Sequence, residues 1–214
     1  FTFSQVKNHT ERLPEKKMIR EKQIEKNLNS LKDFDAEDSR AIIKKSTLDN
    51  GYLLVEIISQ NWVAILVDWE NSTNLSYTYD GNNNLTEELW QNWSNSTWEN
   101  FEKYSYSYDG NNNLTVKLYQ NWNGTDWVNF WKNTYTYDGN NNNIESLYQT
   151  WNSNTWVNVE KLTNTYDVSN NKIAHLVQSW IISDWVNTDL YSYTYDENNN
   201  CTESLFQMWN NSVW

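Results

Sequence analysis

The chain has 214 residues and a net charge of −12 at pH 7, with 14 tryptophans, 14 tyrosines and a single cysteine. Aliphatic residues are too scarce for an ordinary core, and one cysteine excludes both an intrachain disulfide framework and a cysteine-based zinc site. No apolar run approaches the ~20 residues of a membrane-spanning helix, so we expect no membrane insertion.

Charge divides the chain into two parts. Residues 1–48 contain 11 basic and 8 acidic side chains, a net charge of +3, whereas residues 49–214 contain 5 and 20, a net charge of −15. Nucleic acids bind basic surfaces, so no nucleic-acid partner is expected for the acidic part. The first five residues lack a starting methionine and resemble the end of a secretion signal, which predicts a secreted, extracellular or cell-surface protein.

Residues 1–48 predict a short α-helical segment. Within Glu15–Lys32, the apolar residues Ile24, Leu28 and Leu31 fall at i, i+4 and i+7, which indicates an amphipathic helix. The stretch Asp35–Lys45 predicts a second short helix. We expect this segment to cover a sheet edge or to act as a linker, and the alternative is a helix that binds a partner.

From residue 49 onward a unit of 29 residues recurs, and such a period has to be interpreted before any local motif. The first copy is degenerate and more aliphatic, with a two-residue insertion between Trp62 and Trp69. Residues 49–214 therefore contain about five and a half copies, as expected for an array with an atypical terminal repeat. The period is clearest at one aspartate and two tryptophan positions: Asp80, Asp109, Asp138, Asp167 and Asp196; Trp93, Trp122, Trp151, Trp180 and Trp209; Trp98, Trp127, Trp156, Trp185 and Trp214.

Each copy contains two stretches in which side chains alternate with period two, and short polar segments join them. This pattern predicts two strands per copy, and eleven strands from Tyr52 to Trp209. Segments such as Ser94–Thr97 predict four-residue hairpin loops, and Asp109–Asn113 predicts a return turn in which glycine supplies the positive φ. The predicted fold is an all-β repeat array, an antiparallel β-hairpin meander that is twisted or curled. The alternative is a β-solenoid in which each copy is one coil.

The hairpin register follows from placing Trp93 opposite Trp98. Gln91 then faces Asn100 and Leu89 faces Glu102, while on the other side of the sheet Trp90 meets Phe101 and Glu88 meets Lys103. The next copy gives Trp122–Trp127, Gln120–Asn129 and Leu114–Tyr135. The face that carries Trp, Gln, Leu, Asn and Tyr is nearly uniform and is predicted to pack or bind. The other face carries variable charge and is predicted to be solvated.

The motif Tyr-x-Tyr-Asp-x-x-x-Asn-x-Thr stands at Tyr77–Thr86, Tyr106–Thr115 and Tyr193–Thr202. It resembles the tandem YD-type (RHS-like) repeats of secreted bacterial surface proteins, and the resemblance covers residues 49–214. It implies a secreted β-hairpin array that curls into a spiral or shell and has no assigned enzymatic activity. This chain departs from the family pattern in its longer period, its added Trp-x-x-x-x-Trp and its Asn-Asn in place of the usual Gly-Asn.

Catalytic groups are sparse, so we predict that the protein is not an enzyme and needs no cofactor. The two histidines, His9 and His175, lie in different regions, and no Ser–His–Asp set, Cys–His set or phosphate-binding loop is apparent. The turn Asp80–Asn84 resembles the opening of a calcium loop, but Leu85 and Gln91 stand where such a loop needs glycine and glutamate. Calcium at the Asp-Gly-Asn-Asn-Asn turns is the alternative to simple turn capping.

Two functions are compatible with these patterns. Unpaired sheet edges and a uniform aromatic face predict a non-catalytic structural or adhesive protein that self-associates through its edges into a filament or surface layer. The alternative is a carbohydrate-binding module, in which tryptophans stack on sugar rings and Asn and Gln hydrogen-bond to the hydroxyl groups. A third interpretation is that the two tryptophans of each copy only pair with each other. The candidate ligand-binding residues are Trp93, Trp98, Trp122, Trp127, Trp151, Trp156, Trp180 and Trp185.

Overall fold

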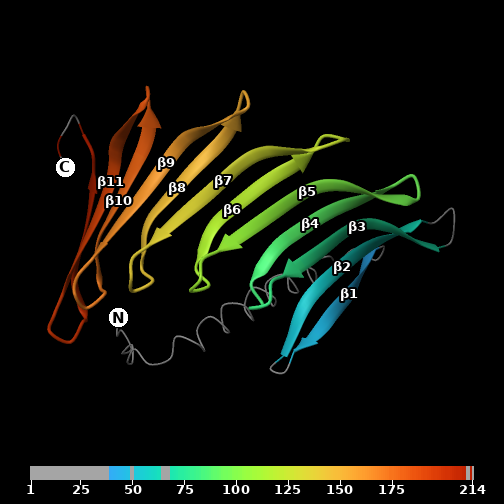
Figure 1. Cartoon of the computed structure of the whole chain (residues 1–214), viewed down its shortest axis with the longest axis horizontal. Coiled ribbons are helices and arrows are strands. Elements are labelled where there is room, and N and C mark those ends of the chain that lie inside the picture. The colour runs from blue at the N-terminus through green and yellow to red at the C-terminus, as the bar shows by residue number, and fades with distance from the viewer. Residues whose placement is uncertain (1–38, 49–50, 64–67, 211–212, 214) are drawn as a thin grey trace. The chain divides into compact units, whose positions relative to one another are not determined.

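The computed structural model describes residues 39–48, 51–63, 68–210 and 213. They form an open antiparallel sheet of twelve strands that follow one another in chain order (Figure 1). The meander prediction is confirmed, and so are the eleven strands expected between Tyr52 and Trp209, which are β2 to β12. The predicted helix Glu15–Lys32 lies outside the described residues.

The strands run from eight to thirteen residues. Their bounds are β1 Ser39–Leu48, β2 Gly51–Val63, β3 Asp68–Tyr79, β4 Leu85–Ser94, β5 Thr97–Tyr108, β6 Leu114–Trp122, β7 Trp127–Tyr137, β8 Asn143–Asn152, β9 Thr155–Tyr166, β10 Lys172–Ile181, β11 Asp184–Tyr195 and β12 Cys201–Met208.

Strand β1 corrects the prediction of a second helix over Asp35–Lys45. Residues 39–48 form a strand that pairs antiparallel with β2, with Ile42 opposite Ile58 and Ile43 opposite Ile57. The two isoleucines are β-branched and favour an extended backbone, and pairing with the aliphatic strand β2 outweighs the weak local preference for helix. Among the described residues, no helix has the length and apolar character needed to cross a membrane.

The chain divides into two compact units, residues 1–74 and residues 75–214. In the described part of the first unit, Leu54 is 3% exposed and Ile57 is 6% exposed, and Lys44 forms an ion pair with Glu56. Gln60 Nε2 donates a hydrogen bond of 2.7 Å to Asn71 Oδ1. This pair reproduces the Gln–Asn pair of the later copies with two extra residues between its members, as the insertion in the degenerate copy predicts.

The second unit contains no buried apolar side chain among its described residues. The only buried residues there are asparagines, Asn84, Asn113 and Asn164. Asn113 shows the arrangement at a return turn: its Nδ2 donates to Asp109 Oδ2 at 3.0 Å and to Asn141 Oδ1 of the next copy at 2.8 Å. The same two bonds recur at Asn84, Asn142 and Asn171. We call this row of side-chain amides the asparagine ladder.

A second row of hydrogen bonds also joins consecutive copies. The Tyr108 hydroxyl donates to the Leu85 carbonyl oxygen at 2.9 Å, and Tyr137 makes the same bond to Leu114. Tyr166 and Tyr195 repeat it on Asn143 and Lys172. We call this row the tyrosine ladder. Because the sheet has so little apolar burial, these two ladders are a large part of what holds one hairpin against the next.

The prediction that glycine supplies the positive φ of the return turns is wrong. Asn112 adopts the positive φ of 61°, and the equivalent asparagines 83, 141, 170 and 199 do the same, whereas Gly110 does not. The turn is a three-residue loop in which Asn112 N donates to Asp109 O and Asp109 N donates to Asn113 O. Asparagine tolerates the left-handed region, and its side chain there accepts the ladder bond, which glycine could not provide.

The opposite ends of the hairpins carry tighter turns than predicted. In the β4–β5 hairpin, Ser94 pairs with Thr97, and only Asn95 and Ser96 form the loop, both at positive φ. Two-residue loops of this kind match the right-handed twist of the strands. The β8–β9 and β10–β11 hairpins have the same turn, whereas the β6–β7 hairpin keeps the expected four-residue loop.

Candidate functional site

The tryptophans predicted to bind a ligand lie in pairs on one face of the second unit. Each pair stands next to the loop of its hairpin, and its two rings meet edge to face. The centroid separations are 4.9 Å for Trp93–Trp98, 5.2 Å for Trp122–Trp127, 4.9 Å for Trp151–Trp156 and 4.9 Å for Trp180–Trp185. All eight predicted site residues are therefore brought together two by two, and we call this side of the sheet the tryptophan face.

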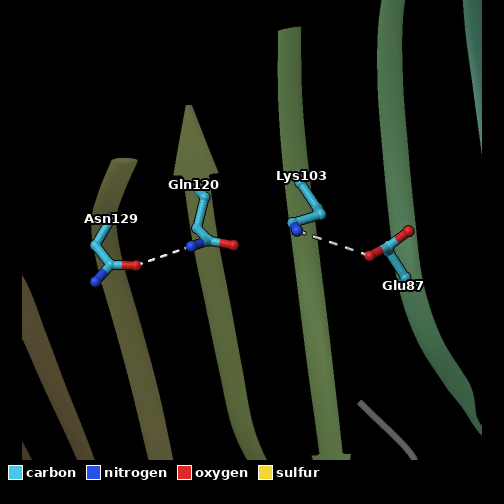
Figure 2. A network of polar contacts seen from close by, with 4 residues as sticks. All are labelled: Glu87, Lys103, Gln120 and Asn129. Carbon is cyan, nitrogen blue, oxygen red and sulfur yellow. Dashed lines mark hydrogen bonds and ion pairs between the residues drawn. The ribbon is translucent and has the colours of Figure 1, made fainter. Parts of the chain in front are cut away.

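Paired side-chain amides stand two residues farther along each hairpin on the same face. Gln120 Nε2 donates to Asn129 Oδ1 at 3.0 Å (Figure 2). The equivalent bonds join Gln91 to Asn100, Gln149 to Asn158 and Gln178 to Asn187. The predicted register is thus confirmed for the first pairs after the turn.

Farther from the turn, the predicted register is wrong by one residue. Gln91 pairs with Asn100, but Trp90 pairs with Glu102, so Phe101 is an extra residue in a β-bulge. Leu89 consequently faces Lys103 and not Glu102. The same bulge recurs in the β6–β7, β8–β9 and β10–β11 hairpins. A bulge leaves one residue without a partner and raises the local twist, and beyond it every side chain changes face.

The bulges place three lysines on the tryptophan face, which sequence reasoning missed. Lys103 pairs with Gln120 of the next hairpin, and its Nζ lies 4.7 Å from the ring centroid of Trp127. Lys132 over Trp156 and Lys161 over Trp185 repeat this contact at 4.5 Å and 4.9 Å. Their spacing of 29 residues was the available signal, because it equals the period of the tryptophans.

The lysines are partly withdrawn from water. The Lys103 side chain is 18% exposed, and its Nζ lies 3.9 Å from Glu87 Oε2, a charge contact drawn in Figure 2. The predicted partner was Glu88, but the bulge in β5 moves Lys103 to the tryptophan face, and Glu88 lies on the opposite face. Burial lowers the pKa of Lys132 from its ordinary value. Cation–π contact with the next tryptophan compensates part of this desolvation and covers one side of that ring.

The aspartates of the return turns cap the backbone, as the turn-capping interpretation predicts. Asp138 Oδ1 accepts from the amides of Asn140 and Asn142 at 2.9 Å each, and its Oδ2 accepts from Asn142 Nδ2 at 3.0 Å. The side-chain bond from Asn142 and the backbone bonds hold the pKa of Asp138 below its usual value, and Asp167 and Asp196 behave alike. In the described ranges, no group of three or more His, Cys, Asp or Glu residues is placed to hold a metal ion.

The histidine and the cysteine of the second unit lie on different strands. His175 Nδ1 lies 2.7 Å from Asn164 Oδ1, and burial lowers its pKa, with Lys172 acting in the same direction. Cys201 is exposed on β12, where its Sγ contacts the Glu203 carbonyl oxygen at 3.3 Å. The recurring chemistry of the described surface is therefore that of aromatic rings, amides and lysines, which bind by stacking and hydrogen bonding.

No family model and no curated protein matches this chain. Among solved structures, a protein with unknown function from Bacteroides fragilis is 21% identical, with a TM-score of 0.42 over 58% of this chain and 92% of that chain. A DUF3836 family protein from Bacteroides vulgatus is 27% identical, with a TM-score of 0.33 over 40% of this chain and 90% of its own. A DUF3836 family protein from Parabacteroides distasonis is 23% identical, with a TM-score of 0.29 over 40% and 88%. These TM-scores, all below 0.5, do not establish a shared fold.

Proposed function

We propose that the chain is a non-catalytic structural or adhesive repeat protein that is secreted or displayed on a cell surface and self-associates through the edges of its sheet. The observation that carries the proposal is that the same contacts between neighbouring copies repeat along the array. Asn171, for example, bonds both to Asp167 of its own turn and to Asn199 of the next turn. A copy supplied by a second chain could use the same kind of contact.

The outer edge of β12 supports this proposal. In the described sheet β12 has a neighbour on one side only, and Cys201 to Phe206 are all exposed. An exposed strand edge pairs readily with another strand, and a second chain added there would extend the sheet by backbone hydrogen bonds. Joining a surface of one copy to a different surface of the next produces an open chain unless the rotation closes a ring.

A proline substitution tests the edge. Trp209 N donates to the Thr188 carbonyl oxygen at 2.7 Å, toward β11. Amides alternate sides along an antiparallel strand, so the amide of Ser204 points away from β11. Ser204→Pro removes an outward donor without removing a bond to β11, and Ser204→Thr is the matched control that keeps the donor.

Sedimentation velocity and electron microscopy of the 214-residue chain provide the measurement. We expect assemblies that grow with concentration for the unaltered chain and for Ser204→Thr, and a single small species for Ser204→Pro with unchanged circular dichroism. Assembly through this edge is contradicted if the unaltered chain stays monomeric at every concentration. It is also contradicted if Ser204→Pro assembles as well as the unaltered chain.

Carbohydrate binding is the second candidate, and the row of tryptophan pairs favours it. Each copy adds two strands, so successive pairs are separated by about 9.6 Å across the sheet. A linear polysaccharide could contact the same set of rings and amides in each copy. This candidate ranks second because the partner ring and the lysine already occupy part of the ring surface. Retardation in gels that contain soluble polysaccharides, lost on changing Trp122 and Trp127 to Ala, would favour it. Equal mobility of both proteins would remove the claim.

A further inference from the structure

The face opposite the tryptophan face, predicted to be simply solvated, carries the exposed phenylalanines among the described residues of the second unit. The bulge residues Phe101 and Phe130 are 48% and 54% exposed, and Val128 next to the β6–β7 turn is 39% exposed. Phe130 meets the edge of the Tyr119 ring at 5.6 Å, and Tyr119 lies 5.5 Å from Trp131. We call these five residues on β5, β6 and β7 the phenylalanine patch.

Three carboxylates lie on the same face, on the β4 and β5 side of the phenylalanine patch, and hydrogen bonds hold two of them, Glu88 and Glu102. Glu102 follows Phe101 directly and accepts a hydrogen bond from the Tyr119 hydroxyl. Glu88 accepts from the Tyr106 hydroxyl at 2.9 Å. Glu99 is exposed and pairs with Asn92, on the same face. An exposed apolar patch with a polar rim is typical of an interaction site.

The same surface already holds one ammonium group. Lys117 Nζ lies 5.1 Å from the ring centroid of Tyr104, 5.6 Å from Tyr106 and 5.7 Å from Trp131. Tyr104 and Tyr119 stack at 4.8 Å, which connects this cation site to the patch. The rings of this face are thus oriented to receive cations.

We propose that the phenylalanine patch and its rim of Glu88, Glu99 and Glu102 bind a cationic amphipathic polypeptide segment, whose apolar side chains cover Phe101 and Phe130 and whose lysines or arginines meet the carboxylates. Charge selects this occupant. A second copy stacked on the same patch would bring two acidic rims together, and anionic lipid headgroups would be repelled in the same way. This surface lies on the face opposite the tryptophans, so the inference goes beyond the proposed function.

A synthetic amphipathic peptide of lysine and leucine tests the proposal, with two comparison peptides: one with glutamate in place of lysine and one with serine in place of leucine. Binding is followed by isothermal titration calorimetry with the full chain. We expect the lysine–leucine peptide to bind, with an affinity that falls as salt is added, and both comparison peptides to bind at least about tenfold more weakly. Equal binding of the glutamate peptide would overturn the charge argument, and equal binding of the serine peptide would overturn the role of the apolar surface.

Matched variants locate the site. The double variant Phe101→Ser, Phe130→Ser removes the exposed rings, and we expect it to weaken binding about tenfold. Phe206→Ser is the control, because Phe206 lies on the same face at 49% exposure and also contacts a tyrosine ring, Tyr191, at 4.8 Å. Changing Glu99 and Glu102 to Gln should remove most of the salt dependence. If Phe206→Ser weakens binding as much as the double variant does, with all variants folded by circular dichroism, the phenylalanine patch is not the site.

Discussion

The two units contain the same kind of antiparallel sheet, but different interactions stabilise it in each. In the described part of residues 39–74, the buried side chains include the aliphatic Leu54 and Ile57. In the described part of residues 75–214, the buried side chains are all asparagines, and the aromatic rings stay partly exposed. A sheet can therefore be held by burial of apolar area or by side-chain ladders that satisfy each polar group, and this chain uses both.

The difference has a consequence for how each unit responds to mutation. Apolar burial is non-directional and scales with the area removed from water, so neighbouring side chains can adjust to a loss. A ladder depends on specific donors and acceptors, and removing one member leaves the others without a partner. The following predictions compare these two kinds of stabilisation.

The largest effect is expected at the buried aliphatic residues of the first unit. Ile57→Ala should lower the free energy of unfolding by about 3 kcal/mol, because it removes buried methyl groups and leaves a cavity opposite Ile43. Chemical denaturation followed by circular dichroism measures the change, and hydrogen exchange shows which strands lose protection. A loss below about 1 kcal/mol, the range of surface substitutions, would show that this unit does not depend on apolar burial.

A smaller loss in the free energy of unfolding is expected when a member of the asparagine ladder is removed. Asn113→Ala removes the bonds to Asp109 and to Asn141, and should cost about 2 kcal/mol by the same denaturation experiment. Asn111→Ala is the control, because Asn111 occupies an exposed position in the same turn, and its change should stay within about 0.5 kcal/mol. Equal costs for the two variants would mean that the inter-copy bond contributes nothing.

Each residue of the tyrosine ladder should contribute less to the free energy of unfolding than a residue of the asparagine ladder. Tyr137→Phe keeps the ring and removes only the bond from its hydroxyl to Leu114, so we expect a loss of about 1 kcal/mol. Tyr148→Phe, whose ring also lies in the array but whose hydroxyl is outside the ladder, should be close to neutral. A larger loss of unfolding free energy for Tyr148→Phe than for Tyr137→Phe would contradict the importance of this ladder.

The smallest effect is expected from the acid titration of the return turns. Hydrogen bonds lower the pKa of Asp138, Asp167 and Asp196 below the ordinary 3.8, so their contribution to stability is complete above that pH. It is lost as the pH falls through the lower pKa values of the folded state. Urea midpoints measured from neutral to strongly acidic pH should therefore decline below about pH 4, and less steeply in Asp138→Asn. An identical decline in that variant would assign the effect to other carboxylates.

The amino-acid sequence by itself determined the 29-residue period, the strand count from Tyr52 onward and the pairing of Trp93 with Trp98, because turn residues and period-two alternation are local signals. It also predicted the Gln–Asn pairs, since they lie within two residues of a turn that sets the register. The eight candidate tryptophans are paired as the alignment implied.

Only the tertiary structure decided what lies beyond the bulges. The bulge residues are Phe101, Phe130, Val159 and Thr188, which share no turn chemistry, and the strands that contain them are two residues longer than their partners. A bulge relieves the mismatch between two twisted strands, which is a property of the pair and not of either segment. Its one-residue shift moved the lysines onto the tryptophan face and exposed the phenylalanines on the other. Strand β1 was missed for a related reason, because its pairing with β2 outweighs the weak helix preference of its own residues.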